Sequence, residues 1–152
     1  MSNGQVRVII ENIEPQVDGG MYPAKRTVGE RVDVRASIFG DGHAHVRAEM
    51  QYKYGMTGPW TVVAMDPGIN DDWFASFPAE QQGRYFFKVR AWIDHFDTWY
   101  DGIRKKTAAG VDVKVELMEG AAFLRSIDKG DGAILAAAKE LEDKGNYQRA
   151  VD

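Results

Sequence analysis

Residues 83–100 read GRYFFKVRAWIDHFDTWY, and within them lies the longest strand-like segment of the chain. Two of the four tryptophans, Trp92 and Trp99, fall in this short stretch. Successive side chains of a strand point to opposite faces, so alternate residues group together. One face would carry Tyr85, Phe87, Val89, Ala91 and Ile93, and the other Arg84, Phe86, Lys88, Arg90, Trp92 and Asp94. So many aromatic rings suit a sugar-stacking platform, the core of a β-sandwich, or an interface.

The same period of two recurs in other short segments between residues 5 and 104. The clearest is Val32 to Ile38, where apolar residues alternate with Asp33, Arg35 and Ser37. Glycine-rich turn signals such as Gly40-Asp41-Gly42 and Asp66-Pro67-Gly68 separate the segments. About seven strands at this spacing predict an immunoglobulin-like antiparallel β-sandwich. We expect its buried positions to include Val34, Ala36, Ile38, Tyr85, Phe87 and Val89.

After Lys106 the pattern changes to that of helices. The spacing of Val111, Val115, Met118 and Ala122 fits one helix face, although residues 111–117 would also fit a strand. A second helix is expected after the capping residue Asp131, with Leu135, Ala138 and Leu141 as its apolar stripe and Gly145 as its stop. The predicted fold is therefore mainly β, with a sandwich over residues 1–106 and the start of a helical segment over residues 107–152.

Composition limits the classes of partner. The chain has 152 residues and a formal net charge of −4, and its basic residues are scattered, which argues against a nucleic-acid partner. It contains no cysteine, and no segment has the apolar length of a signal peptide or a membrane span. We therefore expect a soluble cytoplasmic protein with no membrane partner.

No group of residues predicts catalysis. His43 and His45 would share one side of an extended segment, but their spacing is weak for a metal site. Residues 128–132, DKGDG, lack the ligand spacing of a calcium loop, and neither a G-x-S-x-G motif nor a cysteine nucleophile is present. We expect no catalytic residue, no metal and no cofactor. The tryptophans leave a sugar-binding platform open as an alternative, since Trp is also used to fill a sandwich core.

Several motifs together resemble a known family. They are residues 17–48 (VDGGMYPAKRTVGERVDVRASIFGDGHAHVRA), residues 72–77, residues 83–99, and residues 105–121 (KKTAAGVDVKVELMEGA). In this order they closely resemble the N-terminal region of the bacterial maltose-1-phosphate maltosyltransferases. These α-amylase-superfamily enzymes extend α-1,4-glucans from maltose 1-phosphate. The resemblance runs from about Val8 to about Ala122.

The resemblance implies an immunoglobulin-like sandwich followed by a helical insert, both preceding a catalytic (β/α)₈ barrel. The catalytic carboxylates belong to that barrel, so we expect none of them within residues 1–152. It also implies that these N-terminal domains help to build a homodimer. Expected partners are thus the barrel of the same polypeptide and a second copy, while maltose 1-phosphate and α-1,4-glucan are met only by the whole enzyme. An independent α-glucan-binding module is the alternative.

The candidate interface consists of aromatic and apolar residues that the sandwich core does not need. Three aromatic residues at the end of the long strand and beyond it, and three apolar residues of the helical segment, make up this set: Trp92, Phe96, Trp99, Val115, Met118 and Leu135.

Overall fold

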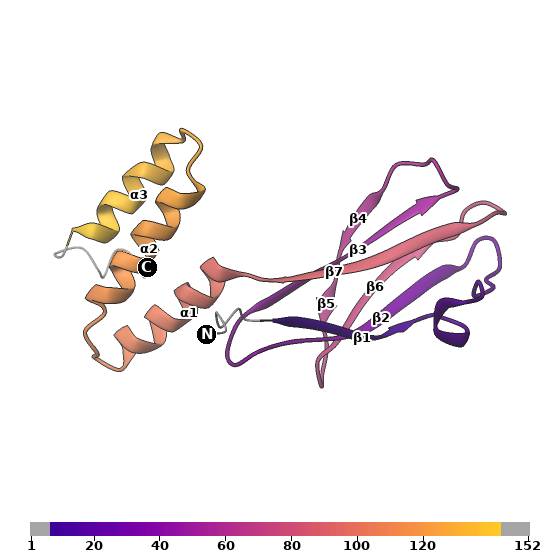
Figure 1. Ribbon diagram of the computed structural model, residues 1–152, viewed down its shortest axis with the longest axis horizontal. Helices are drawn as coiled ribbons and strands as arrows, with labels where there is room; N and C mark the ends of the chain where they lie inside the picture. Colours follow the sequence, from indigo (N-terminus) through magenta and orange to yellow (C-terminus); the bar gives the residue numbers. More distant parts are fainter. Residues whose placement is uncertain (1–6, 144–152) are drawn as a thin grey trace, which may run out of the picture. The chain divides into compact units, whose positions relative to one another are not determined.

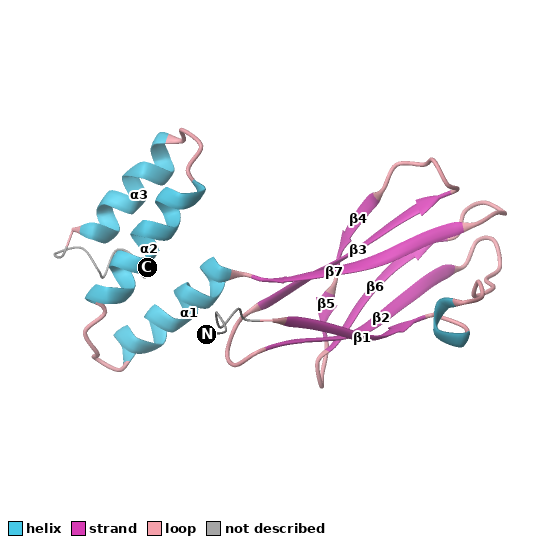
Figure 2. Ribbon diagram, in the orientation of Figure 1, coloured by secondary structure: helices cyan, strands magenta, loops and turns pink. Residues whose placement is uncertain are grey.

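The computed structural model describes residues 7–143 (Figure 1). Its β-strands are β1 (Val8–Glu14), β2 (Arg31–Gly40), β3 (Val46–Tyr54), β4 (Thr61–Ala64), β5 (Asp66–Pro67), β6 (Asp72–Pro78) and β7 (Tyr85–Ile93). A short 3-10 turn, Asp18–Gly20, lies in the connection between β1 and β2. The α-helices are α1 (His95–Ala108), α2 (Lys114–Ile127) and α3 (Gly132–Glu142). All the strands come before all the α-helices, so the predicted mainly-β domain followed by helices is confirmed (Figure 2).

The strands form two antiparallel sheets. One sheet has the order β1-β2-β6-β5 and the other the order β4-β3-β7. Lettered along the chain, these orders read A-B-E-D and C′-C-F, which is the strand order of an immunoglobulin sandwich as far as strand F. The position beside F, where such a sandwich has strand G, is not filled by any strand of residues 7–143, because α1 follows β7 directly.

The core of the sandwich lies between the two sheets. In β2 the alternation seen in the sequence is reproduced as burial, and the prediction that Val34, Ala36 and Ile38 are buried is confirmed. Between the two sheets, the ring of Phe77 on β6, the strand next to β2, stacks on the ring of Tyr52 on β3, with the ring centroids 4.6 Å apart. The expected core residues of β7 are only half-buried: Tyr85, Phe87 and Val89. They are less covered than expected because β7 is the last strand of its sheet.

The helical part begins earlier than the sequence indicated. The described chain divides into two compact units between Ile93 and Asp94, not near residue 106. The Asp94 carboxylate accepts a hydrogen bond from the Asp97 backbone N–H at 2.9 Å, which caps the N-terminus of α1. Residues after Ile93 switch from a period of two to the helical spacing of Phe96, Trp99, Tyr100 and Ile103. This change of period marks the start of α1 in the sequence. It is hard to recognise because the aromatic residues there suit a strand as well as a helix.

The helical unit has its own small core, made of Ile103, Val113, Leu117, Ala121, Ala138 and Leu141. Two helices after residue 108 were predicted, and α2 and α3 confirm them, so the strand alternative for residues 111–117 is wrong. The Asp131 carboxylate caps α3 by accepting the N–H of Ala133, as predicted. Gly145, the predicted stop, lies outside the described residues. None of the described helices combines the length and apolar character needed to cross a bilayer.

Candidate functional site

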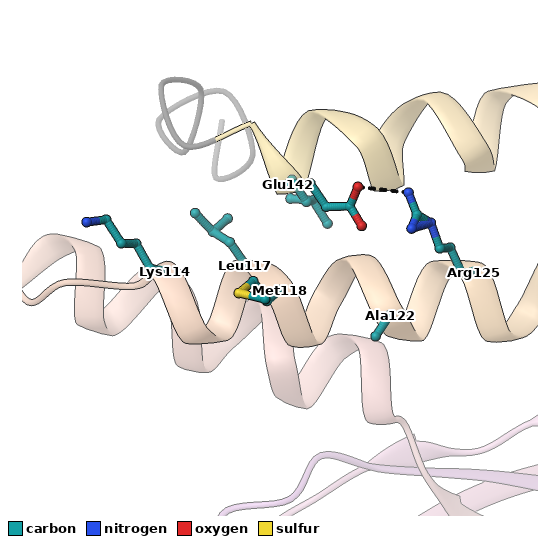
Figure 3. A pocket seen from close by; sticks show the side chains of 7 residues that line it. Lys114, Leu117, Met118, Ala122, Arg125 and Glu142 are labelled. Atoms are coloured by element: carbon teal, nitrogen blue, oxygen red, sulfur yellow. Dashed lines mark hydrogen bonds and ion pairs between the residues drawn. The ribbon is translucent and has the colours of Figure 1, made fainter.

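The helical unit carries an open apolar pocket between α2 and α3, with a volume of about 470 Å³ (Figure 3). Its lining residues are Lys114, Leu117, Met118, Ala122, Arg125, Leu141 and Glu142. The buried stripe of α2 is not the stripe that the sequence suggested. Leu117 and Ala121 are buried in the core, whereas Val115 and Met118 are exposed to solvent. The predicted apolar stripe of α2 is therefore a surface without a partner in the helical unit.

Three candidate interface residues share this exposure. The exposed fraction is 65% for Val115, 66% for Met118 and 46% for Leu135. Single exposed apolar residues are common on folded domains, whereas a continuous apolar patch marks an interaction surface. These three residues are of interest because Met118 also lines the apolar pocket. We call the pocket, taken together with the exposed side chains of Val115 on α2 and Leu135 on α3, the α2–α3 face.

Charged groups stand at the rim of the pocket. The Arg125 guanidinium on α2 lies 2.8 Å from a Glu142 carboxylate oxygen on α3, and this ion pair bridges the two helices (Figure 3). Lys114 supplies a second cation at the start of α2. Both partners of the ion pair are partly exposed, so the bridge contributes little to stability. Its effect is to place both signs of charge beside the apolar surface.

Trp99 lies within the helical unit and is more covered than the other candidate interface residues. Its indole Nε1 donates a hydrogen bond of 2.6 Å to the Glu116 backbone oxygen, and its ring lies against the backbone of Gly120. The centroid of the Phe96 ring lies 5.5 Å from that of Trp99, and Phe96 also stacks on Tyr100. Trp99 thus packs α1 against α2, while the Phe96 side chain remains 43% exposed.

An ion pair at the same junction shifts one acid. The Lys106 ammonium donates a hydrogen bond to the Glu116 carboxylate, and this hydrogen bond lowers the pKa of Glu116 below its ordinary value. Lys106 belongs to α1 and Glu116 to α2, so the pair adds a second link between the two helices. We read its role as structural, because the Lys106 ammonium matches the Glu116 carboxylate across two packed helices.

In the sandwich unit, Trp92 lies on the outer face of β7 and is exposed. Further along this face, Trp60 has two ammonium groups over its ring: that of Lys88 at 4.4 Å and that of Lys53 at 4.9 Å from the centroid. Phe86 lies near the same Lys53, at 5.8 Å. Sugar stacking needs a free ring face, and here both lysines compete with a sugar for the Trp60 ring.

A second open surface, which no sequence pattern indicated, lies along β7. It is a groove of about 870 Å³ between the first half of β7 and the connection that runs from β1 to β2. Cations from both sides line it: Lys25, Arg26, Arg84 and Lys88. The residues of the connection read as a loop with turn signals, so nothing in their pattern places them opposite a strand edge. Among the described residues, no cluster of three or more possible metal ligands is found.

Comparison with known proteins gives these surfaces a context. A family model described as "Alpha-1,4-glucan:maltose-1-phosphate maltosyltransferase, domain N/S" matches residues 6–152. The chain belongs to this family. The maltosyltransferase of Chlorobaculum tepidum is 40% identical over 149 residues, which cover 98% of this chain and 21% of the relative. That of Methylacidiphilum infernorum is 38% identical over 122 residues, covering 80% of this chain and 18% of the relative. That of Burkholderia pseudomallei is 41% identical over 139 residues, which cover 89% of this chain and 12% of the relative.

The chain therefore spans about a fifth or less of the length of these relatives. The resemblance read from the motifs is confirmed, and it extends beyond Ala122 to the end of the matched range. As a member of the maltosyltransferase domain N/S family, the chain corresponds to a part of proteins that are several times longer. Other regions of such a longer protein could therefore cover the exposed apolar surfaces of this part.

Proposed function

We propose that the chain is the non-catalytic N-terminal part of an α-amylase-superfamily enzyme that extends α-1,4-glucans from maltose 1-phosphate, and that it serves assembly. In this role it contributes one surface to a homodimer and others to the catalytic barrel of the same polypeptide. The observation that carries the proposal is the α2–α3 face, an apolar surface without a partner in a chain whose relatives are about five to eight times as long.

The apolar content of this face supports a contact that buries it. Full burial of a Val, Leu or Met side chain is worth about 1.5–3 kcal/mol. Val115 and Met118 are about two-thirds exposed and Leu135 about half exposed, so covering all three contributes roughly 3–5 kcal/mol. This gain is too small to fix two molecules by itself, because association also costs rotational and translational freedom. A stable contact must extend beyond these residues and bury more than about 1,000 Å².

The charges at the rim support a second copy as the partner. A two-fold contact brings the same patch of both subunits together, so the patch must be complementary to itself. The rim carries cations at Lys114 and Arg125 and a carboxylate at Glu142. Because both signs are present beside the apolar surface, a two-fold arrangement can place the cations of one copy against the carboxylate of the other.

Sedimentation equilibrium of the chain and of two variants tests this assembly. Met118→Glu places a charge in the α2–α3 face, whereas Ala136→Glu places the same charge on an exposed position of α3 outside the pocket lining. We expect the wild-type chain and Ala136→Glu to associate, and Met118→Glu to remain monomeric while keeping its helical circular dichroism. Equal association of all three proteins would show that the face is not the contact.

The non-catalytic part of the proposal has its own assay. We expect the chain to release no phosphate from maltose 1-phosphate in the presence of a glucan acceptor. The preparation must be free of any longer maltosyltransferase, since a trace of active enzyme would give the same product. Phosphate release that copurifies with the chain through several columns would overturn the non-catalytic assignment without affecting the dimer contact.

A further inference from the structure

The outer edge of β7 is open for part of its length. β7 is the last strand of the sheet β4-β3-β7, and no described strand pairs with its other edge. In a β-hairpin the next segment of the chain would turn back and fill this place, but here α1 begins two residues after β7 ends. An unpaired strand edge presents a row of free N–H and C=O groups that readily bind another strand.

The register of the β3–β7 ladder shows which backbone groups point to the open edge. The Gly55 N–H donates to the Arg84 oxygen at 2.9 Å, so Arg84 turns its backbone groups toward β3. Because these directions alternate along an antiparallel strand, Phe86 and Lys88 also face β3. Tyr85, Phe87 and Val89 must then direct their N–H and C=O groups away from β3, toward the open edge.

The groove of about 870 Å³ lies along this same stretch. Tyr85, Phe87 and Val89 line it on one side, and residues of the β1–β2 connection such as Tyr22 and Val28 line it on the other. Both of these connection residues are exposed, and the three core residues of β7 are only half-buried. A strand added beside β7, at the usual spacing of about 4.8 Å, would cover both the free backbone groups and these apolar side chains.

The charge of the groove indicates the chemistry of its occupant. Four cations line it, namely Lys25, Arg26, Arg84 and Lys88, and no Asp or Glu is among its described lining residues. The whole chain carries a net charge of −4, so this concentration of positive charge is a local departure from its average. An extended segment with acidic side chains beside its apolar ones fits such a groove.

We propose that β7 is completed by β-augmentation: an extended, acidic segment from the remainder of the maltosyltransferase polypeptide pairs with its open edge at residues 85–89. A segment of the same polypeptide is favoured over a second copy because the matched region is only 12–21% of the length of three of the relatives. Intramolecular pairing also avoids the loss of translational freedom that a partner in solution would impose. This inference rests on the proposed function only in assigning the strand to the rest of an enzyme.

Residue-resolved amide hydrogen exchange tests the pairing. In the 152-residue chain, the amides of Phe86 and Lys88 are held by β3, while those of Phe87 and Val89 point to the open edge. We expect the second pair to exchange at least about tenfold faster than the first, at every protein concentration. In the intact Chlorobaculum tepidum enzyme, the strand that matches β7 should protect both sets of amides.

Each other outcome contradicts a named part of the inference. If all four amides are already protected in the dilute chain, the edge is not open. If the amides of Phe87 and Val89 become protected only as concentration rises, a second copy is the occupant. If the matched strand of the intact relative keeps alternating fast and slow amides, no segment of the polypeptide pairs there. This last result leaves the α2–α3 contact untouched, so it can be told apart from a failure of the proposed function.

Discussion

Replacing Gly120 by alanine tests how α1 and α2 are held together. Gly120 lies in the middle of α2, where the Trp99 indole of α1 approaches the backbone. A Cβ atom at this position would lie 2.2 Å from Cζ2 and 2.5 Å from Cε2 of that ring. Atoms cannot approach so closely, so the indole must move away from α2. The hydrogen bond from Trp99 Nε1 to the Glu116 oxygen is then strained or lost.

The expected loss of stability follows from three contributions. Overpacking of this kind costs about 1–3 kcal/mol, and the lost hydrogen bond adds about 1 kcal/mol. Against these, alanine is favoured over glycine inside a helix by about 0.5–1 kcal/mol. The free energy of unfolding of the helical unit should therefore fall by about 1–3.5 kcal/mol. In a unit of this size such a change lowers the melting temperature by roughly 10 °C.

Gly102→Ala provides the matched control. Gly102 also lies inside a helix, but a Cβ atom built there meets no atom within 4 Å. Only the helix preference remains, so this variant should be more stable than the wild type by about 0.5–1 kcal/mol. Urea unfolding followed by circular dichroism at the helical band measures both variants. If Gly120→Ala is as stable as Gly102→Ala, Trp99 does not pack on Gly120 and the arrangement of α1 against α2 is wrong.

Three further predictions concern other contacts. Because Lys106 lowers the pKa of Glu116 in the folded state, the Lys106–Glu116 pair contributes its full stability above the ordinary glutamate pKa of about 4.3 and loses this contribution as pH falls through the lowered value. Urea unfolding of Glu116→Gln at several pH values should lack this part of the acid dependence, and a pH profile identical to that of the wild type would refute the prediction. Val89→Pro should leave the 152-residue chain folded, because the N–H of Val89 points to the open edge of β7. Lys88→Pro removes an N–H that is bonded to β3 and should lower the free energy of unfolding by at least about 3 kcal/mol, so equal urea midpoints for the two variants would contradict the register. The Trp60 ring is covered by two lysines, so wild type and Trp60→Ala should migrate equally in gels with and without glycogen; retardation of the wild type alone would favour an α-glucan-binding module.

The sandwich was the part that the sequence predicted best. A strand with one buried face must alternate, and β2 does so cleanly from Val32 to Ile38, so its position and inward face could be read directly. The glycine-rich turns in the sequence also indicated where the neighbouring strands end. The order of strands within the two sheets depends on long-range pairing, which no local pattern encodes.

The helical part was predicted less well, for a physical reason. Aromatic residues suit strands as well as helices, so the run after Ile93 hid the start of α1. In α2 the apolar residues cover more than one face, and spacing alone does not say which stripe is buried. The sequence pointed to Val115 and Met118, whereas the core uses Leu117 and Ala121, whose neighbours on α1 and α3 decide the matter. The groove beside β7 could not be found because it depends on a loop folding back against a strand edge.

Methionine-methyl NMR tests the assembly role most directly. Met118 lies in the α2–α3 face, while Met21 and Met56 of the sandwich unit are somewhat more exposed than Met118 and Met50 is fully buried in the sandwich core. With the methionine methyl groups labelled, spectra are recorded over a wide range of protein concentration. We predict that the Met118 signal shifts or broadens as concentration rises, and that the signals of Met21, Met56 and Met50 stay in place. A Met118 signal that is independent of concentration, or a shift confined to the sandwich methionines, would contradict the proposal that the α2–α3 face joins two copies of the chain.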